Sequence, residues 1–303
     1  MNEIRAAIEA VVKVHMSINY RTMNAKPRLI KETCIAGAVL DRTVKLTYGC
    51  VSGRSRKHRE NPTPKEVQDN NDRIAIRKLA RVINANFGPG DYHVVLTDAK
   101  GMTEEEAIKE RQLFLRRMRR EYRKAGSEMK AVWTTEMDPR SHHHLVMSGI
   151  DINRIVSQWP HGRVNVMPLD DARDYTKLAE YFIKQTNAAF RDPSRATRQR
   201  YGRTRNLEDP VIVKQEARVS DLNRNHIKPV KGYHLDPDSI EEYVNPITGI
   251  PTLTYRMIAD DAVSKNGSYR RRMRGKKIRE ESFARFQALR QTEFSDLFEW
   301  GYL

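Results

Sequence analysis

The sequence is poor in cysteine and in long apolar runs, and both shortages narrow the classes of protein that it can encode. It has two cysteines, Cys34 and Cys50, in 303 residues, which is too few for a disulfide framework or a cysteine-rich zinc module. No apolar run approaches the roughly 18 residues that a membrane span needs, and the opening MNEIRAAIEA does not resemble a secretion signal. We therefore expect a soluble, cytoplasmic protein with no membrane partner, in which any metal ligands are histidines or carboxylates.

Acidic residues are also scarce, with 39 Asp and Glu against 55 Lys and Arg, which leaves a net charge of +16. The hydrophobic content of 39% is high enough to bury a core, which excludes wholesale disorder. A large positive charge favours a polyanionic partner, because each phosphate that Lys or Arg neutralises releases counterions. We therefore expect the chain to bind nucleic acid.

The positive charge is concentrated toward the two ends of the chain. Basic and acidic residues number 17 and 8 in residues 1–90, 16 and 15 in residues 91–190, and 22 and 16 in residues 191–303. The densest basic runs are RSRKHRE (54–60), RDPSRATRQRYGRTR (191–205) and RRRMRGKKIR (270–279). Three such runs on one chain favour phosphate-binding surfaces over plain solvated loops.

The middle of the chain predicts alternating strands and helices. Apolar residues at helical intervals predict a helix over 70–86, which the sequence FGPGD then ends. Thr103 and Glu106 form a capping box at the start of a long helix that ends at Gly126. The other expected elements are strands over 91–97, 131–137, 142–149 and 163–168, and helices over 151–158 and 174–185. The turn residues DPRS between two of these strands favour an antiparallel hairpin.

This order of elements predicts an α+β fold, in which a small antiparallel sheet carries helices on one face. We divide the chain into a basic N-terminal region, 1–65, an α+β domain, 66–210, and a basic C-terminal region, 211–303. We expect the C-terminal region to be partly helical, from about residue 276 to residue 298. The patterns within residues 1–60 do not indicate a particular structure.

Three adjacent histidines lie in the second strand of the expected hairpin. Because side chains alternate along a strand, His142 and His144 project from one face and His143 from the other. Glu136, near the end of the first strand, has a carboxylate that could reach the face of His142 and His144. Two imidazoles and a carboxylate suit Mg²⁺ or Mn²⁺ in a phosphoryl-transfer site, and would also accept zinc or cobalt. An exposed histidine-rich strand without an ion is the alternative interpretation.

Tyr181 and Lys184 lie three residues apart and share one face of the last helix of the domain. A phenol can attack phosphorus, but its ordinary pKa near 10 makes it a poor nucleophile at neutral pH. A nearby cation or metal ion favours the phenolate and stabilises charge in the transition state. A core tyrosine beside a surface lysine is the alternative, and the pair by itself does not decide between the two.

In combination, these elements resemble the HUH endonuclease superfamily, and in particular the rolling-circle replication initiators that use one catalytic tyrosine. The resemblance extends over about residues 65–210 and weakly into KGYHLDPDSI. The segments that carry it, besides the histidine strand, are NNDRIAIRKLARVINANFGPGDYHVVLT, WPHGRVNV, LAEYFIKQ and RYGRTRNLEDP. It implies a central antiparallel sheet with packed helices, like the palm of an RNA-recognition motif, with basic extensions at both ends.

The resemblance also implies a role for each site residue. His142 and His144 would be ligands of Mg²⁺ or Mn²⁺, with Glu136 as a candidate third ligand. Tyr181 would be the nucleophile, and Lys184 would contact the phosphate or metal-bound water.

The chain departs from the pattern of the superfamily at two positions. His143 stands where most members have a bulky apolar or aromatic residue. Members with two tyrosines place them four residues apart, whereas position 177 here is Lys177. A mechanism with paired tyrosines is therefore not expected, and Tyr175 lies on roughly the opposite side of the helix from Tyr181.

The implied activity is site-specific nicking of single-stranded or locally melted origin DNA, which leaves a 5′-phosphotyrosine linkage and a free 3′-OH. The partners would be single-stranded DNA, an origin hairpin or duplex, and host replication proteins. The sequence has no G-x-x-x-x-G-K-[ST] phosphate loop, so strand separation would depend on supercoiling, a hairpin or a separate helicase. The basic residues that we expect to contact DNA are Arg163, Lys177, Arg198, Arg200, Arg203 and Arg205.

Other functions use some of the same parts. Relaxases usually place the tyrosine ahead of the histidine strand, whereas here it follows. Single-tyrosine transposases share the order of elements but are usually shorter. A DNA-binding regulator without catalysis is the alternative from another class, and in that case the sheet would only hold DNA.

Overall fold

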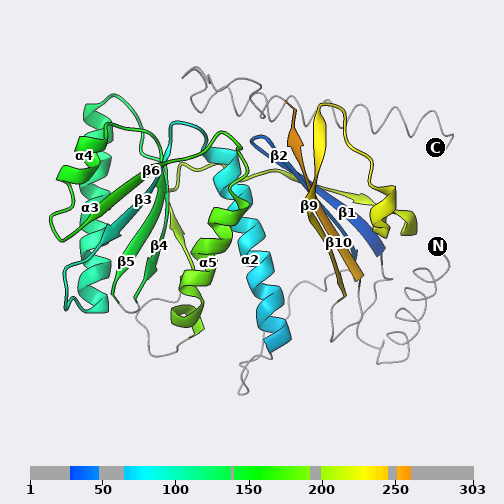
Figure 1. Cartoon of the computed structure of the whole chain (residues 1–303), viewed down its shortest axis with the longest axis horizontal. Helices are drawn as coiled ribbons and strands as arrows, with labels where there is room; N and C mark the ends of the chain where they lie inside the picture. The colour runs from blue at the N-terminus through cyan, green and yellow to red at the C-terminus, as the bar shows by residue number, and fades with distance from the viewer. Residues whose placement is uncertain (1–27, 48–64, 138–139, 192–198, 245–250, 261–303) are drawn as a thin grey trace. The chain divides into compact units, whose positions relative to one another are not determined.

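The computed structural model describes residues 28–47, 65–137, 140–191, 199–244 and 251–260. These residues form two compact units, each built around a five-stranded antiparallel sheet (Figure 1), so the predicted α+β class is confirmed. None of the helices in these ranges is long and apolar enough to cross a membrane.

Several predicted features lie outside the described residues. They are Cys50, Arg198, the basic runs at 54–60 and 270–279, and the expected helix over 276–298.

One unit combines strands from before and after the predicted α+β domain. Its strands are β1 (Arg28–Ala36), β2 (Val39–Thr47), β8 (Ile212–Glu216), β9 (Tyr233–Val244) and β10 (Pro251–Ala259), in the spatial order β8-β1-β2-β10-β9. Two short 3₁₀ turns, η2 (Val219–Leu222) and η3 (Arg224–His226), follow β8. The sequence patterns did not predict this sheet. Strand β2 buries the polar residues Asp41, Arg42 and Thr43 along with its apolar ones, so it lacks the alternation of a half-buried strand.

The other unit contains the elements predicted for the middle of the chain. Its sheet has the spatial order β6-β3-β5-β4-β7. The strands are β3 (Tyr92–Thr97), β4 (Ala131–Glu136), β5 (His142–Met147), β6 (Val164–Pro168) and β7 (Gly202–Arg203). The helices are α2 (Lys65–Asn86), which belongs to this unit from Ile74 onward, α3 (Glu104–Lys124), α4 (Ile152–Ser157) and α5 (Thr176–Arg191). The predicted β4–β5 hairpin is confirmed, with Glu136 paired to His142.

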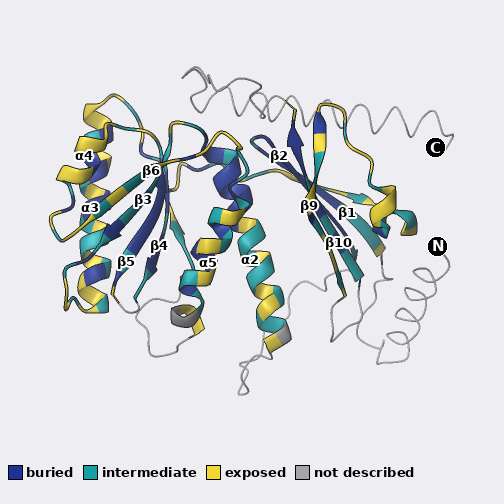
Figure 2. Ribbon diagram, in the orientation of Figure 1, coloured by how far each residue is buried: buried dark blue, intermediate teal, exposed yellow. Residues whose placement is uncertain are grey.

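Helices cover both faces of this sheet, so the prediction of helices on one face was wrong (Figure 1). Helix α3 buries Phe114 and Met118 against Leu145 of β5, whereas α2 and α5 pack around Val146 of the same strand. Strand β5 is therefore apolar on both faces, and most of it is coloured as buried in Figure 2. A short apolar run does not reveal whether one or both of its faces are covered.

Local sequence signals account for the boundaries of α3. The Thr103 side chain accepts a hydrogen bond from the Glu106 backbone, and the Glu106 carboxylate accepts one from the Thr103 backbone, as the predicted capping box requires. The helix ends before Gly126, whose φ of +67° lies in the left-handed region that glycine tolerates best. These signals fix the helix that supports one side of the sheet.

Candidate active site

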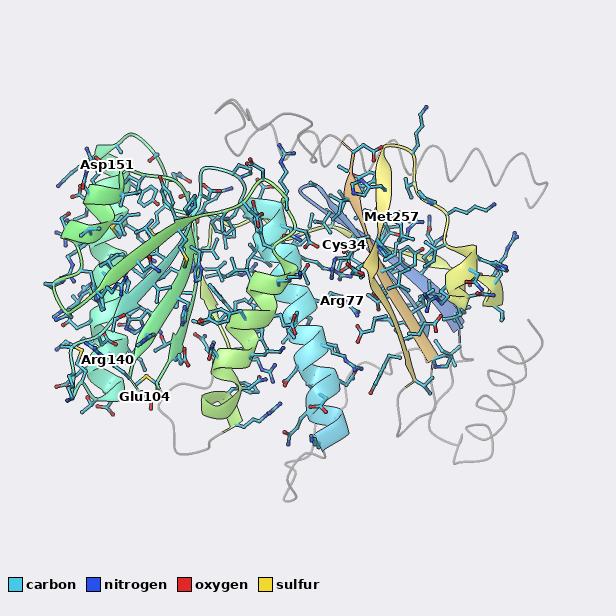
Figure 3. All side chains as sticks on the ribbon, in the orientation of Figure 1. Cys34, Arg77, Glu104, Arg140, Asp151 and Met257 are labelled. Carbon is cyan, nitrogen blue, oxygen red and sulfur yellow. The ribbon has the colours of Figure 1, made fainter. Side chains whose placement is uncertain are left out.

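The β4–β5 hairpin determines which of the three histidines face the same side. Glu136 pairs with His142, and Thr134 pairs with His144. Because cross-strand partners share a face and side chains alternate along a strand, Glu136, His142 and His144 lie on one face and His143 lies on the other. The rings of His142 and His144 have centroids 6.5 Å apart. Arg140, just before β5, marks the end of the sheet where His142 lies (Figure 3).

Helix α5 covers the face that carries His142 and His144. Its residues Phe182 and Ile183 are fully buried in the core, while Tyr181 beside them is 39% exposed. The Tyr181 ring stands edge-on to the His144 ring, with centroids 5.1 Å apart. The fold therefore brings together a solvent-accessible phenol and an imidazole that are 37 residues apart in the sequence.

Glu136 completes this group. Its Oε2 lies 3.3 Å from Nε2 of His144. The His144 side chain is almost fully buried at 3% exposure, whereas that of Glu136 is 23% exposed. The carboxylate therefore connects a buried imidazole to the surface on which Tyr181 is accessible.

A further histidine, His93 of β3, lies at this site and was not among the predicted site residues. It pairs with Val146, two residues beyond His144, and so faces the same side. Its ring centroid lies 5.8 Å from that of His144 and 6.4 Å from that of Tyr181. The alternation in DYHVVLT assigns His93 a face, but only the observed pairing of β3 with β5 shows that it is the face of His144.

Burial keeps the imidazoles of the site neutral. It lowers the pKa of His93 to about 4. Burial, with smaller contributions from the neighbouring histidines, lowers the pKa of His144 to about 3. The pKa of His142 is also lowered, mainly by burial. Neutral imidazole is the form that ligates metal ions, so these side chains are in the state that a metal site requires.

Tyr181 is not activated by the protein groups around it. Partial burial raises the pKa of its phenol, and the negative charge of Glu136 raises it further, while a hydrogen bond with Gln185 acts in the opposite direction. A phenol in this environment is protonated at neutral pH. Attack on phosphorus therefore needs an additional positive charge near the phenol.

The donor chemistry of the site suits a divalent cation. The buried Nδ1 atoms of His142 and His144 and Nε2 of His93 have no hydrogen-bond partner among the described residues. Imidazole and carboxylate together suit Mn²⁺ and accept Mg²⁺. Within the described ranges, however, no three or more His, Cys, Asp or Glu residues are arranged to hold an ion. Ligation by His144 and Glu136 together requires that their direct contact give way.

His143 belongs to a separate buried network on the α3 face of the sheet. Its Nε2 lies 3.1 Å from Oδ2 of Asp98, and its Nδ1 lies 3.0 Å from the hydroxyl of Thr135, which also accepts a hydrogen bond from Arg111. Burial acts to raise the pKa of Asp98, but the hydrogen bond and charge interaction with His143 outweigh it and lower that pKa. His143 is therefore committed to structure and does not face the candidate metal ligands.

The predicted DNA-contacting residues occupy varied positions. Lys184 is exposed and its Nζ lies 2.7 Å from a Glu180 carboxylate oxygen. Arg203 forms a two-point ion pair with Asp209 at 2.5 and 3.3 Å, and the guanidinium of Arg200 lies over the Phe190 ring. Of the others, the exposed ones are Arg163, Lys177 and Arg205.

Comparisons with known proteins point to replication. Residues 91–186 match a family model whose description is that of a replication-associated protein of the ORF2 type. This span runs from β3 to α5 and contains His93, Glu136, His142, His144 and Tyr181. No curated protein and no solved structure matches the chain. The match covers about a third of the chain and is consistent with a replication initiator.

Proposed function

We propose that the protein initiates rolling-circle replication as a metal-dependent enzyme that nicks and rejoins DNA. The observation that carries this proposal is the meeting of Tyr181, His144 and Glu136 on one face of the sheet. This meeting occurs within the segment that matches a replication-associated family. A buried metal-ligand pair beside an accessible phenol is the combination that phosphoryl transfer to tyrosine needs.

His142, His144 and Glu136 would hold Mg²⁺ or Mn²⁺, which supplies polarisation of a non-bridging phosphate oxygen and positive charge near the phenol. The Tyr181 oxygen forms a bond to phosphorus while the bond between phosphorus and the 3′ oxygen breaks. The phenolic proton is lost to solvent, and the leaving oxygen takes up a proton to become a 3′-OH. The products are a 5′-phosphotyrosine and a 3′ end that can prime synthesis.

The geometry supports a single-stranded substrate. Tyr181 is 39% exposed and lies beside residues that are fully buried, so the scissile phosphate must approach along the open side of α5. Exposed basic residues such as Arg163 and Lys177 would contact neighbouring phosphates. Because the phosphodiester energy is kept in the tyrosine linkage, attack by a 3′-OH can later rejoin the strand without ATP.

The proposal is tested with a pool of single-stranded oligonucleotides labelled at the 3′ end, because a 5′-phosphotyrosine retains the 3′ segment. With Mn²⁺ we expect a labelled protein band that survives denaturing electrophoresis and is absent with EDTA. Tyr181→Phe should abolish the band. The control Tyr175→Phe should retain it, because Tyr175 is buried and donates a hydrogen bond to the Asp170 carbonyl. DNA binding without any covalent band would instead indicate a regulator.

A further inference from the structure

The charge of helix α3 is divided between its two halves. Residues 104–115 contain four acidic and two basic side chains, whereas residues 116–124 contain six basic and one acidic. The near balance of charge over residues 91–190 conceals this division. We call the exposed side chains of Arg116, Arg119, Arg120 and Arg123 the α3 basic surface.

The α3 basic surface is a single stripe. At 100° per residue, these four arginines fall within a sector of about 100° and span about 10 Å of helix. The opposite side of the helix carries Phe114, Met118 and Tyr122, which pack on the sheet. The stripe therefore faces away from the core, on the face of the sheet opposite to α5 and Tyr181.

Stability of the helix does not explain this stripe. Basic residues in the last turn, such as Arg123 and Lys124, interact favourably with the helix dipole, but that effect fades beyond one turn. Arg116, Arg119 and Arg120 form no ion pair with any carboxylate in the described ranges. Their neighbours differ: Arg117 pairs with Glu110 at 3.9 Å, and Lys124 pairs with Glu121 at 2.7 Å. The charge of the stripe is thus left for a partner.

The stripe continues onto the segment that follows α5. An open hollow beside α3 is lined by Arg119 together with Arg203, Thr204, Arg205 and Asn206, and by Met129. The β7 residue Arg203 is partly neutralised by Asp209, whereas Arg205 is exposed. The lining contains no aromatic side chain on which an unpaired base could stack. Single-strand sites commonly use such stacking, so a surface of guanidiniums alone fits phosphates.

We propose that the α3 basic surface, continued by Arg205, binds the phosphate backbone of the duplex DNA that flanks the strand being cut. The inference rests on the proposed function. It adds a second DNA contact on the face of the sheet that does not carry Tyr181. Strand β7 is an edge strand next to β4, so DNA that passes this edge can reach both faces.

The test is binding of a labelled duplex of about 20 base pairs to the full chain in EDTA, so that no cleavage chemistry takes part. Replacement of three arginines by glutamine, R116Q/R119Q/R120Q, should weaken binding at least tenfold near 100 mM KCl. It should also reduce the slope of log affinity against log salt by about 2 to 3, since each phosphate contact contributes about 0.9. The charge-conserving variant R116K/R119K/R120K should retain most of the affinity and the slope.

A matched control removes three other exposed lysines, K109Q/K228Q/K231Q, and should weaken duplex binding by less than about threefold, because these positions lie outside the stripe. Equal losses in the control and the arginine variant would overturn the proposal, since net charge alone would then explain them. So would unchanged duplex binding, or an acidic peptide whose binding alone is lost in R116Q/R119Q/R120Q. Absence of the covalent band in the nicking assay, with duplex binding intact, would count against the proposed function only.

Discussion

Three adjacent histidines have different surroundings because strand β5 alternates its side chains between two covered faces. His142 and His144 face α5, whereas His143 faces α3 and is held by Asp98 and Thr135. The motif alone permits any two of the three histidines to be ligands. The alternation rule selects the first and third, and the contacts of His143 show what the middle one does.

At the residue scale, we predict that His144→Ala lowers the affinity of the full chain for Mn²⁺ by about tenfold or more, because one of few neutral nitrogen donors is lost. Isothermal titration calorimetry without DNA measures this directly. His161→Ala is the matched control, because His161 is half-buried but is occupied by Glu110 at 2.8 Å. Equal affinity for Mn²⁺ in the His144 variant and the parent would argue against His144 as a ligand.

The site also shows where sequence reasoning stops. Glu136, His142, His144 and Tyr181 were identified from motifs, because their spacing along two strands and a helix resembles known enzymes. His93 was missed although it lies 5.8 Å from His144 between ring centroids. Its place depends on β3 lying next to β5 in the sheet, and strand order is decided by packing between distant segments.

At the scale of elements, boundaries were predictable where local chemistry sets them. The capping box of Thr103 and Glu106 and the glycine at 126 bracket α3 as expected. The coverage of both faces of the sheet was not predictable from β5, whose apolar residues are consecutive. The sheet containing β1, β2, β8, β9 and β10 was not predicted either, because its strands come from distant parts of the chain and β2 buries polar residues.

The buried contact between Asp98 and His143 joins the segment after β3 to β5. We predict that Asp98→Ala lowers the free energy of unfolding by about 3 kcal/mol, because it removes one partner of a fully buried polar pair. Urea denaturation followed by circular dichroism measures the change. The exposed Asp171→Ala should change the stability by less than about 0.5 kcal/mol. A similar small effect for Asp98→Ala would show that the contact contributes little.

At the scale of the whole molecule, the net charge of +16 conceals two levels of organisation. The ends of the chain are strongly basic while residues 91–190 are almost balanced. Within that balanced third, the acidic side chains are concentrated in the first half of α3 and the basic ones in the second half. A composition averaged over a hundred residues cannot reveal a charged stripe that one helix presents.

We predict that binding of a single-stranded oligonucleotide by the full chain weakens by about 100-fold or more between 50 and 200 mM KCl, as expected for several phosphate contacts. Fluorescence anisotropy in EDTA measures the binding at each salt concentration. Mn²⁺ binding in the absence of DNA should change far less over the same range, which serves as the internal comparison. Salt-independent DNA binding would contradict a contact based mainly on phosphates.

The most direct test of the central claim is to identify the amino acid that carries the DNA. The labelled adduct formed with Mn²⁺ is digested with protease and nuclease, and its peptides are sequenced by mass spectrometry. We predict a nucleotide phosphate on Tyr181 and on no other tyrosine. A phosphate on another residue, such as Tyr175 or Tyr201, or an adduct that persists in Tyr181→Phe, would contradict the proposed nucleophile.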